Sequence, residues 1–114
     1  MTQLTALALS IALEAGIAFA VIRAAGWGSG INAALAASLG TLITHPFAWF
    51  AVPRLAGPIG YPAAVALVET GVVLAESVAY RLIVPLAWPR ALAASLIANA
   101  ASTTVGLAYY ALAA

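Results

Sequence analysis

The stretch AAVALVETGVVLAESVAYRLIV, residues Ala63 to Val84, decides the fold because it is long and apolar enough to cross a bilayer yet carries two carboxyl groups. An acidic residue near the centre of a membrane helix costs about 2.5 to 3.5 kcal/mol, whereas each Leu, Ile or Val returns about 0.3 to 0.6 kcal/mol. The favourable insertion free energy of the apolar residues therefore only about offsets the cost of Glu69 and Glu76, so this helix needs polar partners. Spacings of four, three and four residues place Glu69, Val73, Glu76 and Tyr80 along one stripe, which we expect to face the interior.

Composition indicates an integral membrane protein. The chain is 66% hydrophobic and 6% charged, and its mean hydropathy of +1.12 lies outside the range of soluble domains. It has no Lys and no Asp, and its three Glu all fall within apolar segments, so we expect no nucleic-acid partner. The absence of Cys excludes disulfides, thiolate chemistry and Cys-ligated metals. We expect no cofactor.

Four spans account for the chain, at about residues 4–25, 31–52, 63–84 and 91–112. A hydrocarbon core of about 30 Å needs roughly 20 helical residues, so little remains besides three short connections. The first span lacks a preceding basic region and is interrupted by Glu14, which favours a retained helix over a cleaved signal peptide. The proline-rich sequence RLAGPIGYP is predicted to connect the second and third spans. These features predict one all-α transmembrane domain, a four-helix bundle with antiparallel neighbours.

The two halves of the sequence share short segments. ALAASL occurs at Ala34–Leu39 and again at Ala91–Leu96, and LEAG at Leu13–Gly16 is similar to VETG at Val68–Gly71. The offsets of 57 and 55 residues predict a duplicated helical hairpin, which would be a parallel repeat about the membrane normal. The alternative is chance similarity between Ala-rich helices.

Arg and Trp residues flank the predicted spans. Arg23, Arg81 and Arg90 lie toward the first and third connections, and Arg54 lies toward the other side. The positive-inside rule then places those two connections in the cytoplasm and both termini outside, unless Arg23 and Arg81 snorkel within the membrane. The predicted interfacial residues are Trp27, Trp49, Trp88, Arg23, Arg54, Arg81 and Arg90.

Every span also carries polar residues at helical spacing, as Ser38, Thr41 and His45 do in the second. For the Ser, Thr and Asn residues we favour interhelical hydrogen bonding over ligand binding. A lone His without neighbouring Cys or Asp is poor evidence for a metal site. The predicted intramembrane polar network is Glu14, Ser38, Thr41, His45, Glu69, Glu76, Tyr80, Asn99 and Ser102.

Depth along the helices, at about 1.5 Å per residue, predicts which members of this network meet. Glu69 and His45 fall on the same side of the membrane middle, and Glu76 is level with Asn99. Glu14 lies at mid-membrane, where it can face Ser38, Thr41 or Ser102.

Two family resemblances arise from these residues. Chain length, four spans and Glu14 in the first helix resemble the small multidrug resistance exporters, whose corresponding carboxylate exchanges protons for cationic drugs. This chain lacks that family's aromatic and glycine pattern in the third span and adds Glu69 and Glu76. The succession of Glu14, THPFAW at Thr44–Trp49, ETGVVLAESVAYR at Glu69–Arg81 and NAAS at Asn99–Ser102 is similar to small uncharacterised four-helix bacterial inner-membrane proteins. That resemblance implies a location in the bacterial inner membrane but no activity.

The expected function is that of a small accessory or scaffold subunit, which packs with a larger membrane complex or forms a homo-oligomer within the lipid bilayer. The alternative is a proton-coupled small-molecule transporter that uses its intramembrane Glu residues. An enzyme is not expected, because neither a nucleophile elbow nor a metal motif is present.

Overall fold

The computed structural model describes residues 2–113, and it is all-helical with no strand in that range. The helices are α1 (Gln3–Ala25), α2 (Gly30–Ile59), α3 (Tyr61–Ile83) and α4 (Trp88–Ala113). All four are long and apolar enough to cross a membrane by length and composition. This confirms the predicted all-α architecture with four candidate membrane spans.

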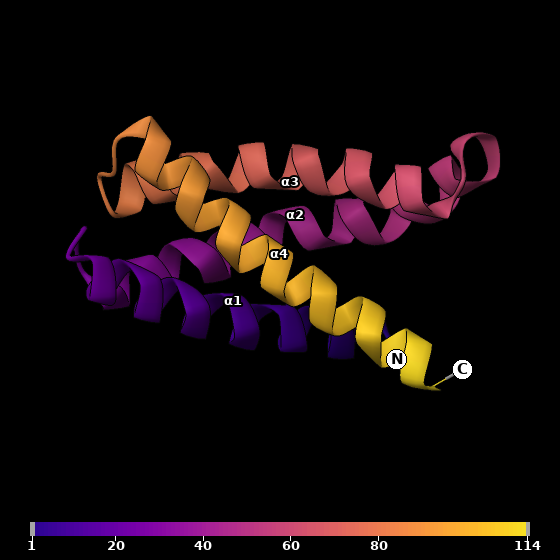
Figure 1. Ribbon diagram of the computed structural model, residues 1–114, viewed down its shortest axis with the longest axis horizontal. Coiled ribbons are helices and arrows are strands. Elements are labelled where there is room, and N and C mark those ends of the chain that lie inside the picture. The colour runs from indigo at the N-terminus through magenta and orange to yellow at the C-terminus, as the bar shows by residue number, and fades with distance from the viewer. Residues whose placement is uncertain (1, 114) are drawn as a thin grey trace.

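The helices form a ring in which each packs on the helices before and after it, and α4 closes the ring against α1. The predicted pairings of the first helix with the second and of the third with the fourth are therefore confirmed. Figure 1 shows α4 crossing the bundle obliquely, with both chain termini at one end. We call that end, which also holds Gly60, the termini end, and the opposite end, with residues 26–29 and 84–87, the loop end.

The loop end is closed by well-formed helix caps. Gly26 ends α1 with φ of 69°, and its N–H donates to the Arg23 carbonyl while the Trp27 N–H donates to the Ile22 carbonyl, at 3.2 and 3.0 Å. This pair of bonds is the Schellman arrangement, which favours glycine at the left-handed position. Ser29 then caps α2 by accepting a hydrogen bond from the Asn32 N–H at 3.2 Å.

The second helix does not end at the predicted limit of its span near Val52, because α2 continues through Pro53 and Pro58 to Ile59. Proline holds φ near the helical value and removes a single N–H donor, so it weakens a helix without always ending it. The chain reverses instead at Gly60, where φ is 87°. Only glycine adopts such a conformation readily. The proline-rich segment predicted as a connection is therefore largely helical.

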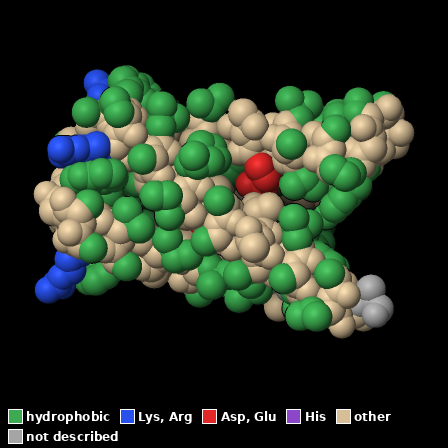
Figure 2. Space-filling view, in the orientation of Figure 1, with side chains coloured by type: hydrophobic (Ala, Val, Ile, Leu, Met, Phe, Trp, Pro, Cys, Tyr) green, Lys and Arg blue, Asp and Glu red, His purple; other side chains and the backbone are tan. Residues whose placement is uncertain are grey.

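Basic side chains gather at the loop end. Figure 2 shows them on the side where Figure 1 places the α1–α2 and α3–α4 connections. The Cζ atom of Arg81 lies 4.8 Å from the centroid of the Trp88 ring, and the Cζ atom of Arg90 lies 5.4 Å from the centroid of the Trp27 ring. Arg over Trp is a favourable cation–π arrangement, and Trp prefers membrane interfaces, so this cluster is suited to a headgroup region.

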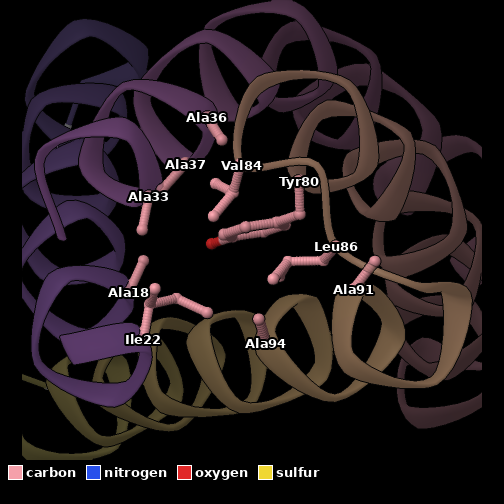
Figure 3. Close-up of a cluster of buried hydrophobic side chains, with 10 residues drawn as sticks. All are labelled: Ala18, Ile22, Ala33, Ala36, Ala37, Tyr80, Val84, Leu86, Ala91 and Ala94. Carbon is pink, nitrogen blue, oxygen red and sulfur yellow. The ribbon is translucent and has the colours of Figure 1, made fainter. Parts of the chain in front are cut away.

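A solid apolar core fills the half of the bundle next to the loop end. Its members are Ala18, Ile22, Ala33, Ala36, Ala37, Tyr80, Val84, Leu86, Ala91 and Ala94. The many Ala residues let the helices approach closely, which favours packing in a membrane. Figure 3 shows the Tyr80 ring crossing the centre of this cluster, with its hydroxyl pointing toward Ala18 and Ala33. This packing leaves the other half of the bundle to form the site.

Candidate functional site

A cavity of about 520 Å³ occupies the half of the bundle next to the termini end, and all four helices line it. Figure 2 shows acidic side-chain atoms at the head of a hollow on this side of the molecule. All three Glu line the cavity, so they face the bundle interior as their insertion cost predicts. Its polar lining consists of Ser10, Glu14, Thr41, Thr44, His45, Tyr61, Glu69, Glu76, Asn99, Ser102, Thr103 and Tyr110, together with Trp49.

Glu14 and Glu76 form the floor of the cavity, next to the solid core. Glu14 comes from α1 and Glu76 from α3, and their side chains are only 2% and 1% exposed. The two carboxyl groups lie close enough to interact directly. The stripes that carry them place Ala18 and Tyr80 one turn further toward the loop end, where both belong to the apolar core. Two carboxyl groups therefore meet near the middle of the bundle.

Hydroxyl groups from α2 and α4 surround this pair. Thr44 Oγ1 lies 2.8 Å from Glu76 Oε2, and Thr41 Oγ1 lies 3.4 Å from Glu76 Oε1. Ser102 Oγ donates to Glu14 Oε2 at 3.2 Å, a contact within the set that helix depth predicted. Asn99 lies near Glu76, and its Nδ2 donates to the Ser95 carbonyl at 2.9 Å and to the Ser95 hydroxyl at 3.3 Å.

Two hydroxyl groups of the site each have more acceptors nearby than they have hydrogens. Thr44 Oγ1 is 2.9 Å from the Gly40 carbonyl as well as being near Glu76, and Ser102 Oγ is 3.3 Å from the Asn99 carbonyl as well as being near Glu14. Each hydroxyl has one hydrogen, so it can donate to only one of its two neighbours. The Glu14 Oε1 atom is buried and has no hydrogen-bond partner.

An ionised carboxylate can only accept hydrogen bonds, so it cannot relieve this shortage. A proton on either carboxyl group supplies the missing donor and removes a charge from an apolar environment, where it is expensive. The pair is therefore built to hold at least one proton, or another cation in its place.

Gly40 makes the space that Glu76 occupies. A Cβ atom added at Gly40 would lie 2.9 Å from Cγ of Glu76, closer than such atoms pack. The absence of a side chain on α2 thus lets the Glu76 side chain lie against the backbone and reach Thr41 and Thr44.

Glu69 and His45 lie on the cavity wall, further toward the termini end. Among residues 2–113, no hydrogen bond joins these two side chains, although both line the cavity. Glu69 is half-buried and lies beside Thr103. His45 instead stacks on Trp49, with ring centroids 5.9 Å apart, and its Nδ1 atom has no partner.

Two members of the predicted polar network, Ser38 and Tyr80, lie away from the cavity. Ser38 does not line the cavity, and its hydroxyl donates to the Ala34 carbonyl at 2.7 Å. Tyr80 belongs to the apolar core rather than to the polar network, and its hydroxyl is unpartnered. Trp49, predicted at the membrane interface, lines the cavity.

Sequence reasoning missed Gly40, Thr44 and Thr103 as site residues. Thr44 follows Thr41 by three residues and Gly40 by four, so the three share a helix face that was available in the sequence. Thr103 follows Asn99 by four residues. Spacing could thus have found all three, but it could not show which of the neighbouring stripes faces the carboxyl pair.

No family model, curated protein or solved structure matches this chain. What the site can do therefore follows from its residues. It combines buried carboxyl groups that can hold and release protons with a cavity large enough for a small molecule.

Proposed function

We propose that this chain is a proton-coupled carrier, in which a small solute binds in the cavity between the four helices. The observation that carries this proposal is the placement of two buried carboxyl groups, those of Glu14 and Glu76, in the lining of a cavity of about 520 Å³. Ionisable groups within membrane spans mark proton relays and substrate pathways more often than they mark simple packing. A proton bound to either carboxyl group adds a hydrogen-bond donor where the neighbouring hydroxyl groups have too few hydrogens for their acceptors.

Coupling follows from competition for the same acceptors. A solute that brings N–H or O–H donors to the cavity floor can donate hydrogen bonds to Glu14 and Glu76. It thereby lowers the affinity of the pair for its proton. The packed core around Ile22 and Tyr80 separates this floor from the loop end. Alternating access then requires the half of the bundle next to the loop end to open while the half next to the termini end closes.

The test uses the purified chain in proteoliposomes loaded with a pH-sensitive dye. Small amines, amides, alcohols and carboxylic acids are added outside one at a time, and internal pH is followed. We expect at least one class to move protons through the wild-type chain, with little movement in Glu14→Gln or Glu76→Gln. Ser38→Ala is the matched control, because Ser38 lies outside the cavity. Flux that is equal in all four proteins would contradict the carrier.

An accessory or scaffold subunit of a larger membrane complex is the second candidate. Gly16 on α1 and Gly71 on α3 each have open space where a side chain would lie, which would allow another helix to approach. Purification in mild detergent separates the two functions. Stoichiometric co-purification with larger subunits supports the accessory function, whereas a homo-oligomer that exchanges protons for solute supports the carrier.

We further propose a bacterial inner-membrane location, from the sequence resemblance alone, and an origin by hairpin duplication. Matched positions in the two halves support the duplication. Gly16 and Gly71 both face open space, and Ala37 and Ala94 both lie in the apolar core. Chains in which the two connections at the loop end, residues 26–29 and 84–87, are exchanged should fold if the hairpins are equivalent.

A further inference from the structure

We propose that the Glu14–Glu76 pair is also a sodium site, in which one Na⁺ takes the place of one proton. This goes beyond solute transport, because ion binding at the cavity floor needs no solute. The inference starts from Glu14 Oε1, an oxygen of a fully buried side chain that has no partner and lies beside a second carboxyl group.

The donor set consists entirely of oxygen. Around Glu14 and Glu76 lie the hydroxyl groups of Thr41, Thr44 and Ser102. Hard cations prefer carboxylate, hydroxyl and carbonyl oxygens, whereas zinc and the softer metals prefer nitrogen and sulfur. In the described residues no three His, Cys, Asp or Glu side chains gather at one place, so an ion here would rely on hydroxyl groups beside the two carboxyl groups.

The hydroxyl groups can turn their hydrogens away from the carboxyl pair. Thr44 can donate to the Gly40 carbonyl at 2.9 Å, and Ser102 can donate to the Asn99 carbonyl at 3.3 Å. These two hydroxyl groups then present only lone pairs to the site, as coordination of a cation requires. Because the Gly40 and Asn99 carbonyl groups can accept these hydrogens, the same residues can surround either a proton or a metal ion.

The oxygen spacings also suit an ion of this size. Oxygens bound at about 2.3 to 2.6 Å, the range for the similarly sized Ca²⁺, lie roughly 3.2 to 3.7 Å apart at right angles. The Thr41–Glu76 and Ser102–Glu14 oxygen pairs are already 3.4 and 3.2 Å apart. Thr44 and Glu76, at 2.8 Å, need to separate slightly.

Charge balance favours a monovalent ion exchanged one for one. Two protonated carboxyl groups are neutral, and replacement of one proton by Na⁺ releases H⁺ and leaves one protonated carboxyl, one carboxylate and one Na⁺, which are again neutral. A net charge in the low-dielectric interior would be costly. No Arg among the described residues lines the cavity to compensate a second carboxylate.

The test measures ²²Na⁺ binding and proton release by the purified, solute-free protein in detergent and weak buffer. We expect saturable Na⁺ binding with about one proton released per ion. Choline chloride at equal ionic strength should release none, and CaCl₂ should not replace NaCl. Thr44→Val removes one ligand oxygen at nearly constant shape and should weaken Na⁺ binding by about tenfold or more. Thr44→Ser restores the oxygen and should restore binding, and Ser38→Ala should bind like the wild type.

Circular dichroism and size-exclusion chromatography establish that each variant is folded before its binding is measured. Absent Na⁺ binding, equal proton release by choline, release by Ca²⁺ alone, or full binding by Thr44→Val and Glu14→Gln would each overturn the sodium site. The carrier and the ion site fail separately. A chain that binds Na⁺ but moves no solute refutes only the carrier, and solute-driven proton flux without Na⁺ binding refutes only the ion site.

Discussion

Thr44 Oγ1 lies 2.8 Å from Glu76 Oε2, while the same oxygen lies 2.9 Å from the Gly40 carbonyl one turn earlier in α2. A hydroxyl has a single hydrogen, so one of these contacts needs a hydrogen from elsewhere. A protonated Glu76 can supply it by donating to Thr44. The direction of the Thr44 hydrogen bond therefore depends on whether Glu76 carries a proton.

Gly40→Ala should destabilise the bundle, because the new Cβ would lie 2.9 Å from Cγ of Glu76. Overpacking of this kind costs about 1 to 3 kcal/mol of unfolding free energy, measured by denaturant titration in mixed micelles. The matched control is Gly16→Ala, where the added methyl meets nothing within 4 Å. That change should raise stability by about 0.5 to 1 kcal/mol through helix propensity. Equal effects at the two positions would show that Glu76 does not pack against α2.

Glu76→Gln should leave the unfolding free energy within about 1 kcal/mol of wild type, because the amide brings donors to a site with surplus acceptors. Glu76→Ala should lose roughly 2 to 4 kcal/mol, because it leaves a void and removes the partner of Thr41 and Thr44. Thermal unfolding in detergent compares the two variants. If Gln destabilises as much as Ala, the fold depends on an ionised carboxylate at this position.

Tyr80→Phe should stabilise the protein. The Tyr80 hydroxyl is buried in the apolar core without a hydrogen-bond partner, and its removal avoids a desolvation cost of about 1 to 3 kcal/mol. Tyr80→Ala serves as the contrasting variant and should lose about 3 to 5 kcal/mol through cavity formation. Unfolding free energies of the three proteins provide the comparison. A loss of stability in the Phe variant would reveal a hydroxyl partner in the membrane-embedded protein.

The loop end should face the cytoplasm, since Arg23, Arg81 and Arg90 are at that end and only Arg54 lies toward the other. The chain has no Cys, so single cysteines can report on each end without background. In intact cells, a membrane-impermeant maleimide should label Ala113→Cys, whereas Ala87→Cys should react only after permeabilisation. The opposite pattern would place the cavity mouth on the cytoplasmic side.

Most of the fold was predictable from hydropathy alone. Four apolar segments of suitable length can satisfy their backbone hydrogen bonds in lipid only as helices, and the short connections make sequential helices neighbours. The exception was the end of α2, because proline weakens a helix without always ending it, and the reversal depends on Gly60 with φ of 87°. The sequence shows that glycine and proline are present, but it does not show at which of them the backbone turns.

The inward orientation of the carboxyl groups follows from the residue types alone, because their insertion cost rules out a position against lipid. Which carboxyl groups lie together depends on how the helices pack. Helical spacing assigned Glu69 and Glu76 to one stripe of α3, and both line the cavity, but only Glu76 lies at its floor with Glu14. Close packing against Gly40 brings Glu76 to Glu14. Such choices depend on the rotation and approach of whole helices, which are set by small contacts spread along their length.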